Sequence, residues 1–245
     1  RNQQDRNPTV GCFSLGRMTR LVTSGCSFTQ YCWNTWADYL GEHFNEFQQV
    51  GLSGADNATI ARNVIANAKE GDTVVIMWTG FDRWSMYTDE WQHRGCISGN
   101  KEFYANHYHP VERFVTTMDY IKMVELDSLN KGYDVYHFSG YPFFLSEFKT
   151  EHDDLRDIFS QYKINNMYVD NISLQTFQES INECFITSHK YNDADTHPTP
   201  LTHWKYLNEV VAPVLDISIN QSIESDVLFE QQEVLAGRIP YDQST

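Results

Sequence analysis

Four short segments of the chain hold residues that are able to take part in polar chemistry. Three of them combine glycine with serine, threonine or charged residues: Gly25–Thr29, Gly51–Gly54 and Thr79–Arg83. The fourth, Asp193–Pro200, contains His197 with carboxylates close to it in the sequence. A serine hydroxyl becomes a competent nucleophile when an imidazole accepts its proton and a carboxylate orients that imidazole. These residue types therefore permit hydrolysis through a covalent intermediate.

Each of the three glycine-containing segments follows, or ends, a short apolar run. These runs, at residues 20–24, 47–50 and 73–79, predict strands, and apolar residues at helical spacing predict helices near 33–44 and 57–68. Such alternation is typical of a parallel sheet with right-handed crossovers. Ligands bind beyond the carboxyl ends of parallel strands, where the fold should bring the three segments side by side.

The pattern after residue 83 is less regular. We expect a long loop or lid at 84–109, a helix at 110–131 and a fourth strand at 133–138. Further helices are expected at 152–162, 173–182 and 204–215. The organisation predicted is an N-terminal arm (1–17), one α/β domain (18–216) and an acidic C-terminal tail (217–245).

The charge balance excludes some classes of partner. The 245 residues include 33 acidic and 18 basic side chains, a net charge of −15, which disfavours nucleic acid and anionic membrane surfaces. No apolar run is long enough to span a bilayer. Without a visible signal peptide, a cytoplasmic or virion-associated location is expected rather than secretion.

Cysteine and histidine spacing gives no sign of a metal site. The five cysteines form no metal-binding pattern and are too few and odd in number for a disulfide scaffold. His107 and His109 have no carboxylate or thiol cluster beside them. Neither a metal nor a cofactor is therefore expected.

Together the four segments resemble the sequence blocks of the SGNH (GDSL-like) hydrolase family, in the family's order, from residue 20 to about 215. Gly25-Cys-Ser-Phe-Thr29 resembles the first block, Gly-Asp-Ser-(Leu/Phe)-Thr, and Leu52-Ser-Gly-Ala55 resembles the second. Thr79-Gly-Phe-Asp82 lies where the family has Gly-Gly-Asn-Asp, and Asp195-Thr-His-Pro-Thr199 resembles the last block. The resemblance implies a single three-layer α/β domain of the flavodoxin-like SGNH hydrolase type, with a central parallel sheet in the order 2-1-3-4-5.

The same resemblance implies the site residues. Ser27 would be the nucleophile and His197 the base, while the N–H groups of Ser27 and Gly54 would hold the oxyanion. The family's acid position, three residues before the histidine, holds an alanine here. Of the two carboxylates beside that alanine, Asp195 is preferred to Asp193.

One departure affects the oxyanion hole. Phe81 stands where the family has an asparagine that donates a side-chain hydrogen bond. Because phenylalanine cannot donate, Thr79, Arg83 or a residue of the 84–109 loop would have to complete the hole.

Aromatic residues in the 84–109 segment suggest what the substrate would be. Trp84, Tyr87 and Trp91 would either pack beneath the loop or form a stacking platform for a sugar. The prediction is a serine ester hydrolase that removes O-acyl, for example O-acetyl, groups from a carbohydrate or a small ester.

A second hypothesis comes from another functional class. The missing asparagine and the long insertion at 140–183 also suit a weak or inactive hydrolase-fold protein. Such a protein would be a structural or binding component of a larger assembly, a virion included. Its N-terminal arm and acidic tail would supply the contacts.

Overall fold

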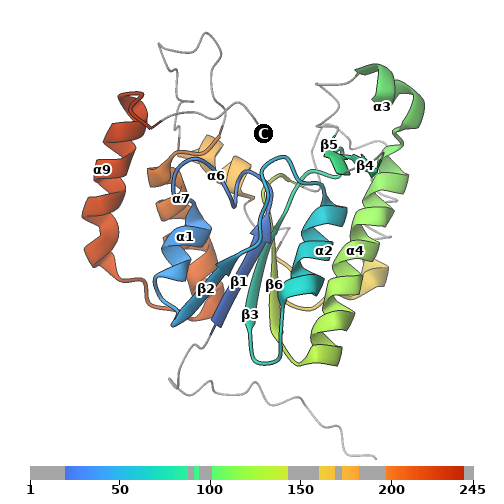
Figure 1. Ribbon diagram of the computed structural model, residues 1–245, viewed down its shortest axis with the longest axis horizontal. Helices are drawn as coiled ribbons and strands as arrows, with labels where there is room; N and C mark the ends of the chain where they lie inside the picture. The colour runs from blue at the N-terminus through green and yellow to red at the C-terminus, as the bar shows by residue number, and fades with distance from the viewer. Residues whose placement is uncertain are drawn as a thin grey trace, which may run out of the picture.

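A parallel four-stranded sheet forms the centre of the molecule (Figure 1). The computed structural model describes residues 20–87, 91–93, 101–142, 160–168, 173–181 and 197–239. The sheet order is β2-β1-β3-β6, from β1 (Arg20–Gly25), β2 (Glu46–Gln49), β3 (Thr73–Trp78) and β6 (Asp134–Ser139). This confirms the predicted α/β class and the order of its first four strands. Among the described residues no fifth strand joins this sheet.

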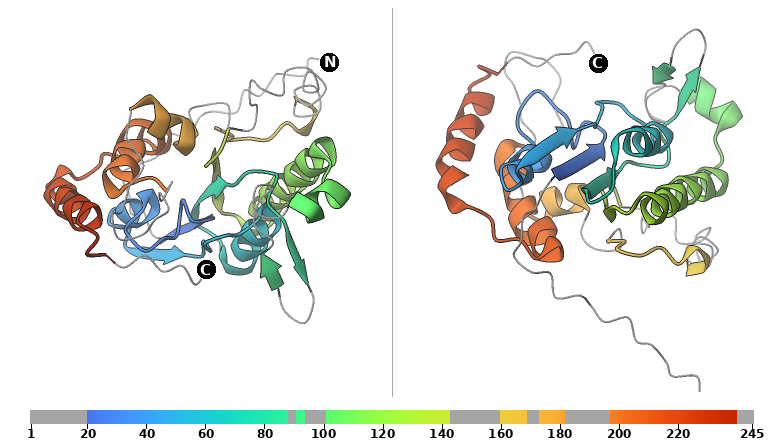
Figure 2. Two further views of the ribbon diagram at one scale, coloured as in Figure 1. Left: turned by 90° about the horizontal axis from the view of Figure 1, so that it is seen from above. Right: turned by 60° about the horizontal axis from the view of Figure 1, so that its bottom comes forward.

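Helices cover both faces of the sheet and make three layers (Figures 1 and 2). One face is covered by α2 (Asn57–Asn67) and α4 (Pro110–Lys131). The other is covered by α1 (Trp36–Gly41), α6 (Leu174–Ser180) and α7 (Pro200–Tyr206). Helix α2 begins, and helix α4 ends, at a residue that favours a helix terminus. Asp56 caps α2 by accepting from Thr59 N at 2.9 Å, and α4 stops at Gly132 in the left-handed conformation.

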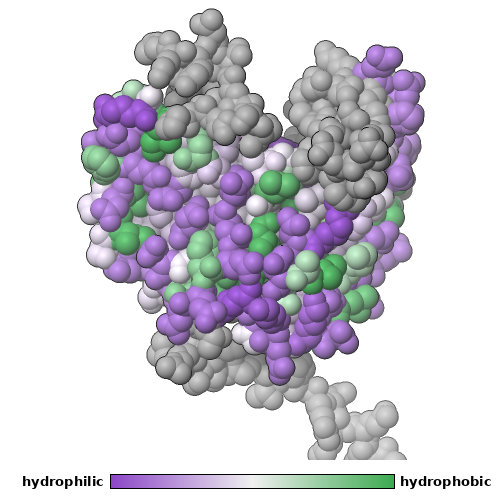
Figure 3. Space-filling view, in the orientation of Figure 1, coloured by the Kyte–Doolittle hydropathy of each residue, from purple (hydrophilic) through white to green (hydrophobic). Residues whose placement is uncertain are grey.

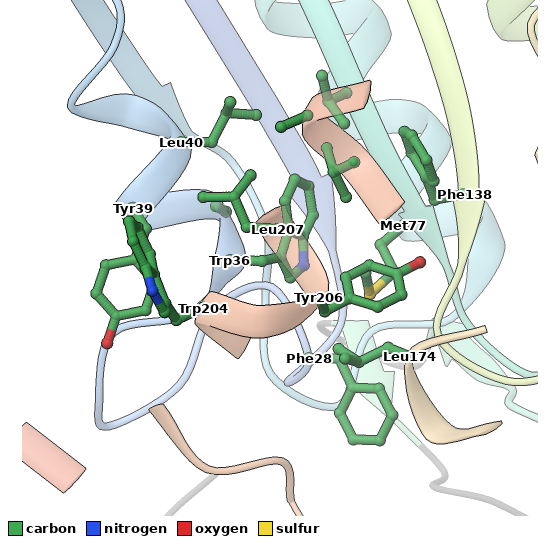
Figure 4. Packing of buried hydrophobic residues seen from close by; sticks show 14 of the residues in the cluster. Phe28, Trp36, Tyr39, Leu40, Met77, Phe138, Leu174, Trp204, Tyr206 and Leu207 are labelled. Atoms are coloured by element: carbon green, nitrogen blue, oxygen red, sulfur yellow. The ribbon is translucent and has the colours of Figure 1, made fainter. Parts of the chain in front are cut away.

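The central strand β3 contributes to both cores. Val74, Ile76 and Trp78 pack towards α2 and α4, whereas Val75 and Met77 pack towards α1 and α7. Figure 4 shows the second of these cores, where Met77 lies near Tyr206 of α7 and Phe138 of β6. Successive side chains of a strand point to opposite faces of the sheet. A strand whose two faces are both covered by helices must therefore be apolar at every position.

The segment predicted as a loop or lid contains regular structure. It holds an antiparallel hairpin of β4 (Ser85–Tyr87) and β5 (Trp91–His93), followed by α3 (Lys101–His107). These elements are too short to show a clear periodicity in the sequence, which explains the incorrect expectation.

The C-terminal part is also more structured than the sequence suggests. A π-helical turn, η2 (Leu207–Val211), and α8 (Ala212–Leu215) continue from α7. A 3₁₀ turn, η3 (Gln221–Ile223), then leads into α9 (Glu224–Leu235), which packs against α7. Part of the segment named as an acidic tail is thus a packed helix, whereas the predicted arm at 1–17 lies outside the described residues.

Hydrophilic side chains predominate on the face shown in Figure 3, with hydrophobic residues in small separate groups. None of the helices within the described ranges is long and apolar enough to cross a membrane.

Candidate active site

Ser27 lies in a tight turn directly after β1. The N–H groups of Thr29 and Gln30 both donate to Cys26 O, at 2.9 and 3.0 Å. The turn also requires glycine at position 25, since an added Cβ would lie 2.1 Å from Thr29 Oγ1 and 2.9 Å from Met77 O. Ser27 is 3% exposed. The fold therefore fixes the predicted nucleophile at the carboxyl edge of the sheet.

The loop after β2 is tied to the Ser27 turn by two hydrogen bonds. Leu52 N donates to Gly25 O at 3.0 Å, and Ser53 N donates to the Gln30 side-chain carbonyl at 3.1 Å. Gly54 follows with φ of +78°, and nothing lies within 4 Å of the place where its Cβ would be. The backbone at Gly54 therefore borders open space beside the turn that carries Ser27.

The N–H groups of Ser27 and Gly54 are both available for a ligand. Within the described part of the chain, neither of them donates to another protein group. Backbone donors left unused at neighbouring turns are what the oxyanion of an acyl-transfer intermediate requires. The structure thus places these two N–H groups in loops that are hydrogen-bonded to each other.

His197 approaches the same place from the segment before α7. Its ring stacks on Tyr31, with centroids 4.0 Å apart and planes 20° apart, and meets the edge of Phe28 at 5.8 Å. Phe28 directly follows Ser27. The Ser27 hydroxyl makes no hydrogen bond to His197 or to any other described residue. Direct proton transfer between two such side chains requires a separation of about 2.6–3.2 Å, and the described geometry does not contain that contact.

The backbone around His197 is held by the start of α7. Thr199 caps the helix by accepting from Thr202 N at 3.2 Å, and Trp33 donates from Nε1 to Pro198 O at 3.0 Å. His203, one turn into α7, is buried, and burial together with the nearby His197 lowers its pKa to about 3. His203 is therefore neutral and closed to solvent.

Thr79 is held by Asn57, the first residue of α2. Asn57 Nδ2 donates to Thr79 O at 3.1 Å, and Asn57 Oδ1 accepts from Thr79 N at 3.0 Å. This double contact fixes the end of β3. The Thr79 side chain is fully buried, and its hydroxyl has no partner among the described residues. In the sequence, the signal for this contact is an asparagine placed directly after Asp56, the residue that caps α2.

Phe81 belongs to the hydrophobic core on the α2 and α4 side of the sheet. It is 8% exposed and packs in the core beneath α2 and α4, where its ring meets Phe114 perpendicularly at 5.9 Å. The residue at this position is thus a core side chain in this protein.

Arg83 and Tyr141 form a pair beside the Ser27 turn. The Arg83 guanidinium donates to Tyr141 Oη at 3.4 Å and lies 5.8 Å from the centre of the ring. Tyr141 in turn stacks on Phe28, with centroids 4.9 Å apart. Sequence reasoning missed Tyr141 because nothing marks it apart from its place just after β6.

The other predicted site residues are only partly placed. Asp193 and Asp195 lie outside the described residues. Trp84 lies beneath the Arg113 guanidinium, 4.6 Å from its ring centre, while Tyr87 and Trp91 belong to β4 and β5 and their side chains are outside the description. In the described ranges no group of three or more histidine, cysteine or acidic residues is placed to hold a metal ion.

No protein-family model and no curated protein matches this chain. Solved structures do match. One is a catalytic mutant of the acetylxylan esterase Axe2 from Geobacillus stearothermophilus, at 12% identity and a TM-score of 0.50, covering 84% of this chain and 98% of that one. Another is phospholipase A1 from Streptomyces albidoflavus, at 12% identity and a TM-score of 0.44, covering 81% and 98%. At this identity the likeness is one of fold, and the fold is that of a single α/β domain similar to the Axe2 esterase.

Proposed function

We propose that the protein is a serine ester hydrolase that removes O-acyl groups, O-acetyl among them, from a carbohydrate. The observation that supports this most directly is the pair of free N–H groups at Ser27 and Gly54. They lie in two loops that are hydrogen-bonded to each other at the carboxyl edge of the sheet, with His197 against the residue next to Ser27. The fold-level similarity to an acetylxylan esterase agrees with the proposal.

In the proposed mechanism Ser27 Oγ attacks the acyl carbonyl while His197 takes the hydroxyl proton. The carbonyl oxygen becomes an oxyanion held by the N–H groups of Ser27 and Gly54. His197 then gives its proton to the leaving sugar oxygen, and an acyl group stays on Ser27. Water, deprotonated by His197, attacks this acyl group and releases the acid, while the proton returns to Ser27. Asp195 orients the imidazole in this proposal.

Thr79 and Arg83, the two residues expected to complete the oxyanion hole, differ in their exposure to solvent. Thr79 is fully buried, with its N–H already donated to Asn57. Arg83 is partly exposed and makes one long hydrogen bond, to Tyr141. Of the two, only Arg83 is therefore open to a ligand.

Release of acetate from acetylated xylan and from p-nitrophenyl acetate tests the proposal. Ser27→Ala should lower kcat/KM by at least about 10³-fold, because the covalent route is lost. Ser53→Ala is the matched control, since it removes a nearby hydroxyl and keeps the N–H that donates to Gln30. Equal rates in wild type and Ser27→Ala would refute the mechanism.

A second candidate is a binding or structural component of a larger assembly, a virion included. The missing hydrogen bond between Ser27 and His197, within the part of the chain that the structure describes, favours it. This candidate predicts no ester hydrolysis by the wild-type protein and stable co-purification with a particle.

A further inference from the structure

Two arginines near the candidate active site have no acidic partner. Neither Arg83 nor Arg113 has a carboxylate oxygen within 4.0 Å among the described residues. Arg20, by contrast, pairs with Asp72 at 2.9 Å. In a chain with 33 acidic and 18 basic residues, the buried guanidinium of Arg113 without a carboxylate is unexpected, because buried charges are normally paired.

Arg113 reaches the segment around Arg83 from α4. Its Nη2 donates to Arg83 O at 3.0 Å, and its guanidinium lies 4.6 Å from the centre of the Trp84 ring. Arg113 is 7% exposed, and its Nε has no partner among the described residues. It therefore fixes the Arg83 backbone and adds a second positive charge behind it.

The Arg83 side chain keeps most of its hydrogen-bonding capacity unused. A guanidinium has five N–H donors, and in the described part of the chain the one acceptor of these is Tyr141 Oη, at 3.4 Å. Tyr141 stacks on Phe28, the residue after Ser27. The Arg83 guanidinium is thus connected through the Tyr141 ring to the Ser27 turn. Burial raises the pKa of Tyr141 to about 12, which keeps its hydroxyl protonated.

Asp82 precedes Arg83 in the chain. Burial acts to lower the pKa of the Arg83 guanidinium, but the nearby Cys26, the hydrogen bond to Tyr141 and the charge of Asp82 raise it overall. No described carboxylate oxygen lies within 4.0 Å of either guanidinium, so no direct ion pair neutralises their positive charges. A ligand that satisfies the site should therefore carry a planar anionic group, which arginine binds in a bidentate manner.

We propose that Arg83, with Tyr141 beside it and Arg113 behind it, binds the carboxylate of an acidic sugar during ester hydrolysis at Ser27. We call these three residues the Arg83 subsite. This inference rests on the proposed function for the ester and the sugar, and it assigns Arg83 to substrate recognition rather than to the oxyanion. The substrate class is thus an O-acylated, carboxylate-bearing carbohydrate such as a hexuronate.

Binding of D-galacturonate and D-galactose, measured by calorimetry, tests the subsite without any catalysis. The wild-type protein should bind the acid about tenfold more tightly or better, because hydrogen bonds to charged groups are among the stronger ones. Arg83→Gln should abolish this preference, and Arg83→Lys should keep part of it, provided that each variant unfolds at the wild-type temperature. Arg62→Gln, on the exposed side of α2, is the matched control and should keep the preference. Equal affinity for the two sugars, or a preference that survives Arg83→Gln, would overturn the inference.

The kinetic form of the test compares kcat/KM for O-acetylated galacturonate with that for its neutral methyl ester. Arg83→Gln should lower the ratio of these two values about tenfold or more. An oxyanion role would lower both values together, leave the ratio unchanged and contradict the subsite. Ser27-dependent hydrolysis without any acid preference would overturn the subsite alone. Arg83-dependent binding of galacturonate without any hydrolysis would overturn the proposed function alone.

Discussion

The His197 imidazole lies on the face of the Tyr31 ring, with centroids 4.0 Å apart and planes inclined by 20°. Tyr31 belongs to the loop that begins with Ser27, whereas His197 belongs to the segment before α7. The stack therefore connects His197 directly to the loop that carries Ser27. It restricts the orientation of the His197 ring through contact with its face.

Replacing Tyr31 by leucine should lower kcat/KM for ester hydrolysis about 2- to 13-fold. The reason is the loss of an aromatic pair worth roughly 0.5–1.5 kcal/mol, which would otherwise hold the base in place. Tyr31→Phe keeps the ring and should retain most of the activity in the same assay. Equal activity of Tyr31→Leu and wild type would show that the stack does not orient His197.

Introducing the family's asparagine at position 81 should damage the protein rather than repair an oxyanion hole. Phe81→Asn removes a buried ring that packs on Phe114 and buries an amide in an apolar core. We expect a loss of about 3–5 kcal/mol in the free energy of unfolding, measured by denaturant titration. A rise in kcat with little loss of stability would mean that position 81 can reach the oxyanion.

Two glycines at the site should respond differently to alanine. Gly54→Ala places a Cβ in open space and costs about 1–2 kcal/mol of unfolding free energy, from the positive φ alone. It also keeps the N–H proposed for the oxyanion. Gly25→Ala forces a Cβ against Thr29 and Met77 O, so its unfolding midpoint should fall further. The reverse order of midpoints would contradict the geometry of the Ser27 turn.

Two buried histidines should make stability depend on pH. Burial lowers the pKa of His203 to about 3, helped by His197, and lowers the pKa of His137 to about 4 against a weaker opposing effect of Glu125. Below the unfolded pKa of 6.5 the unfolded chain binds a proton at each site and the folded chain does not. The free energy of unfolding should therefore fall by about 1.4 kcal/mol per pH unit for each histidine as the pH decreases from 6.5 towards 4.5.

The contribution of one histidine can be isolated by substitution. His203→Gln should reduce the slope of unfolding free energy against pH by about 1.4 kcal/mol per unit in that window. His109→Gln, at an exposed position before α4, is the control for removing an imidazole. An unchanged slope in His203→Gln would mean that His203 is charged in the folded protein.

The sheet was predictable because its strands carry strong local signals. The run from Val74 to Trp78 is apolar at every position, as a strand covered on both faces must be, and the structure gives it that place. The sheet class follows from the alternation of such strands with helices, whereas the strand order was implied by the family resemblance. The hairpin of β4 and β5 was missed because each strand has only three residues.

The C-terminal helix α9 was missed for a different reason. Its acidic composition indicated a solvated tail, yet Val227 and Val234 are seven residues apart and lie on one buried side. Glu230, which looked like part of a charge run, accepts hydrogen bonds from Tyr39 Oη at 2.9 Å and from Asn34. Tertiary partners of this kind are not visible in the local sequence.

At the site, sequence patterns could indicate segments but not the directions of side chains. The Ser27 turn and the Gly54 loop do lie together, as expected of segments after adjacent strands. Phe81 could not be assigned to the core from its neighbours in sequence, because the deciding contact is with Phe114 on α4. Tyr141 and Asn57 act through contacts between distant segments and were missed for the same reason.

The central claim, that Ser27 is a nucleophile activated by His197, is tested most directly by covalent labelling. The protein is incubated with a fluorophosphonate and digested, and the modified peptide is sequenced by mass spectrometry. The account predicts a single phosphonylated residue, Ser27, in the wild-type protein, and little or no label in a folded His197→Ala variant. Label on another residue, no label on wild type, or equal labelling of the His197→Ala variant would contradict it.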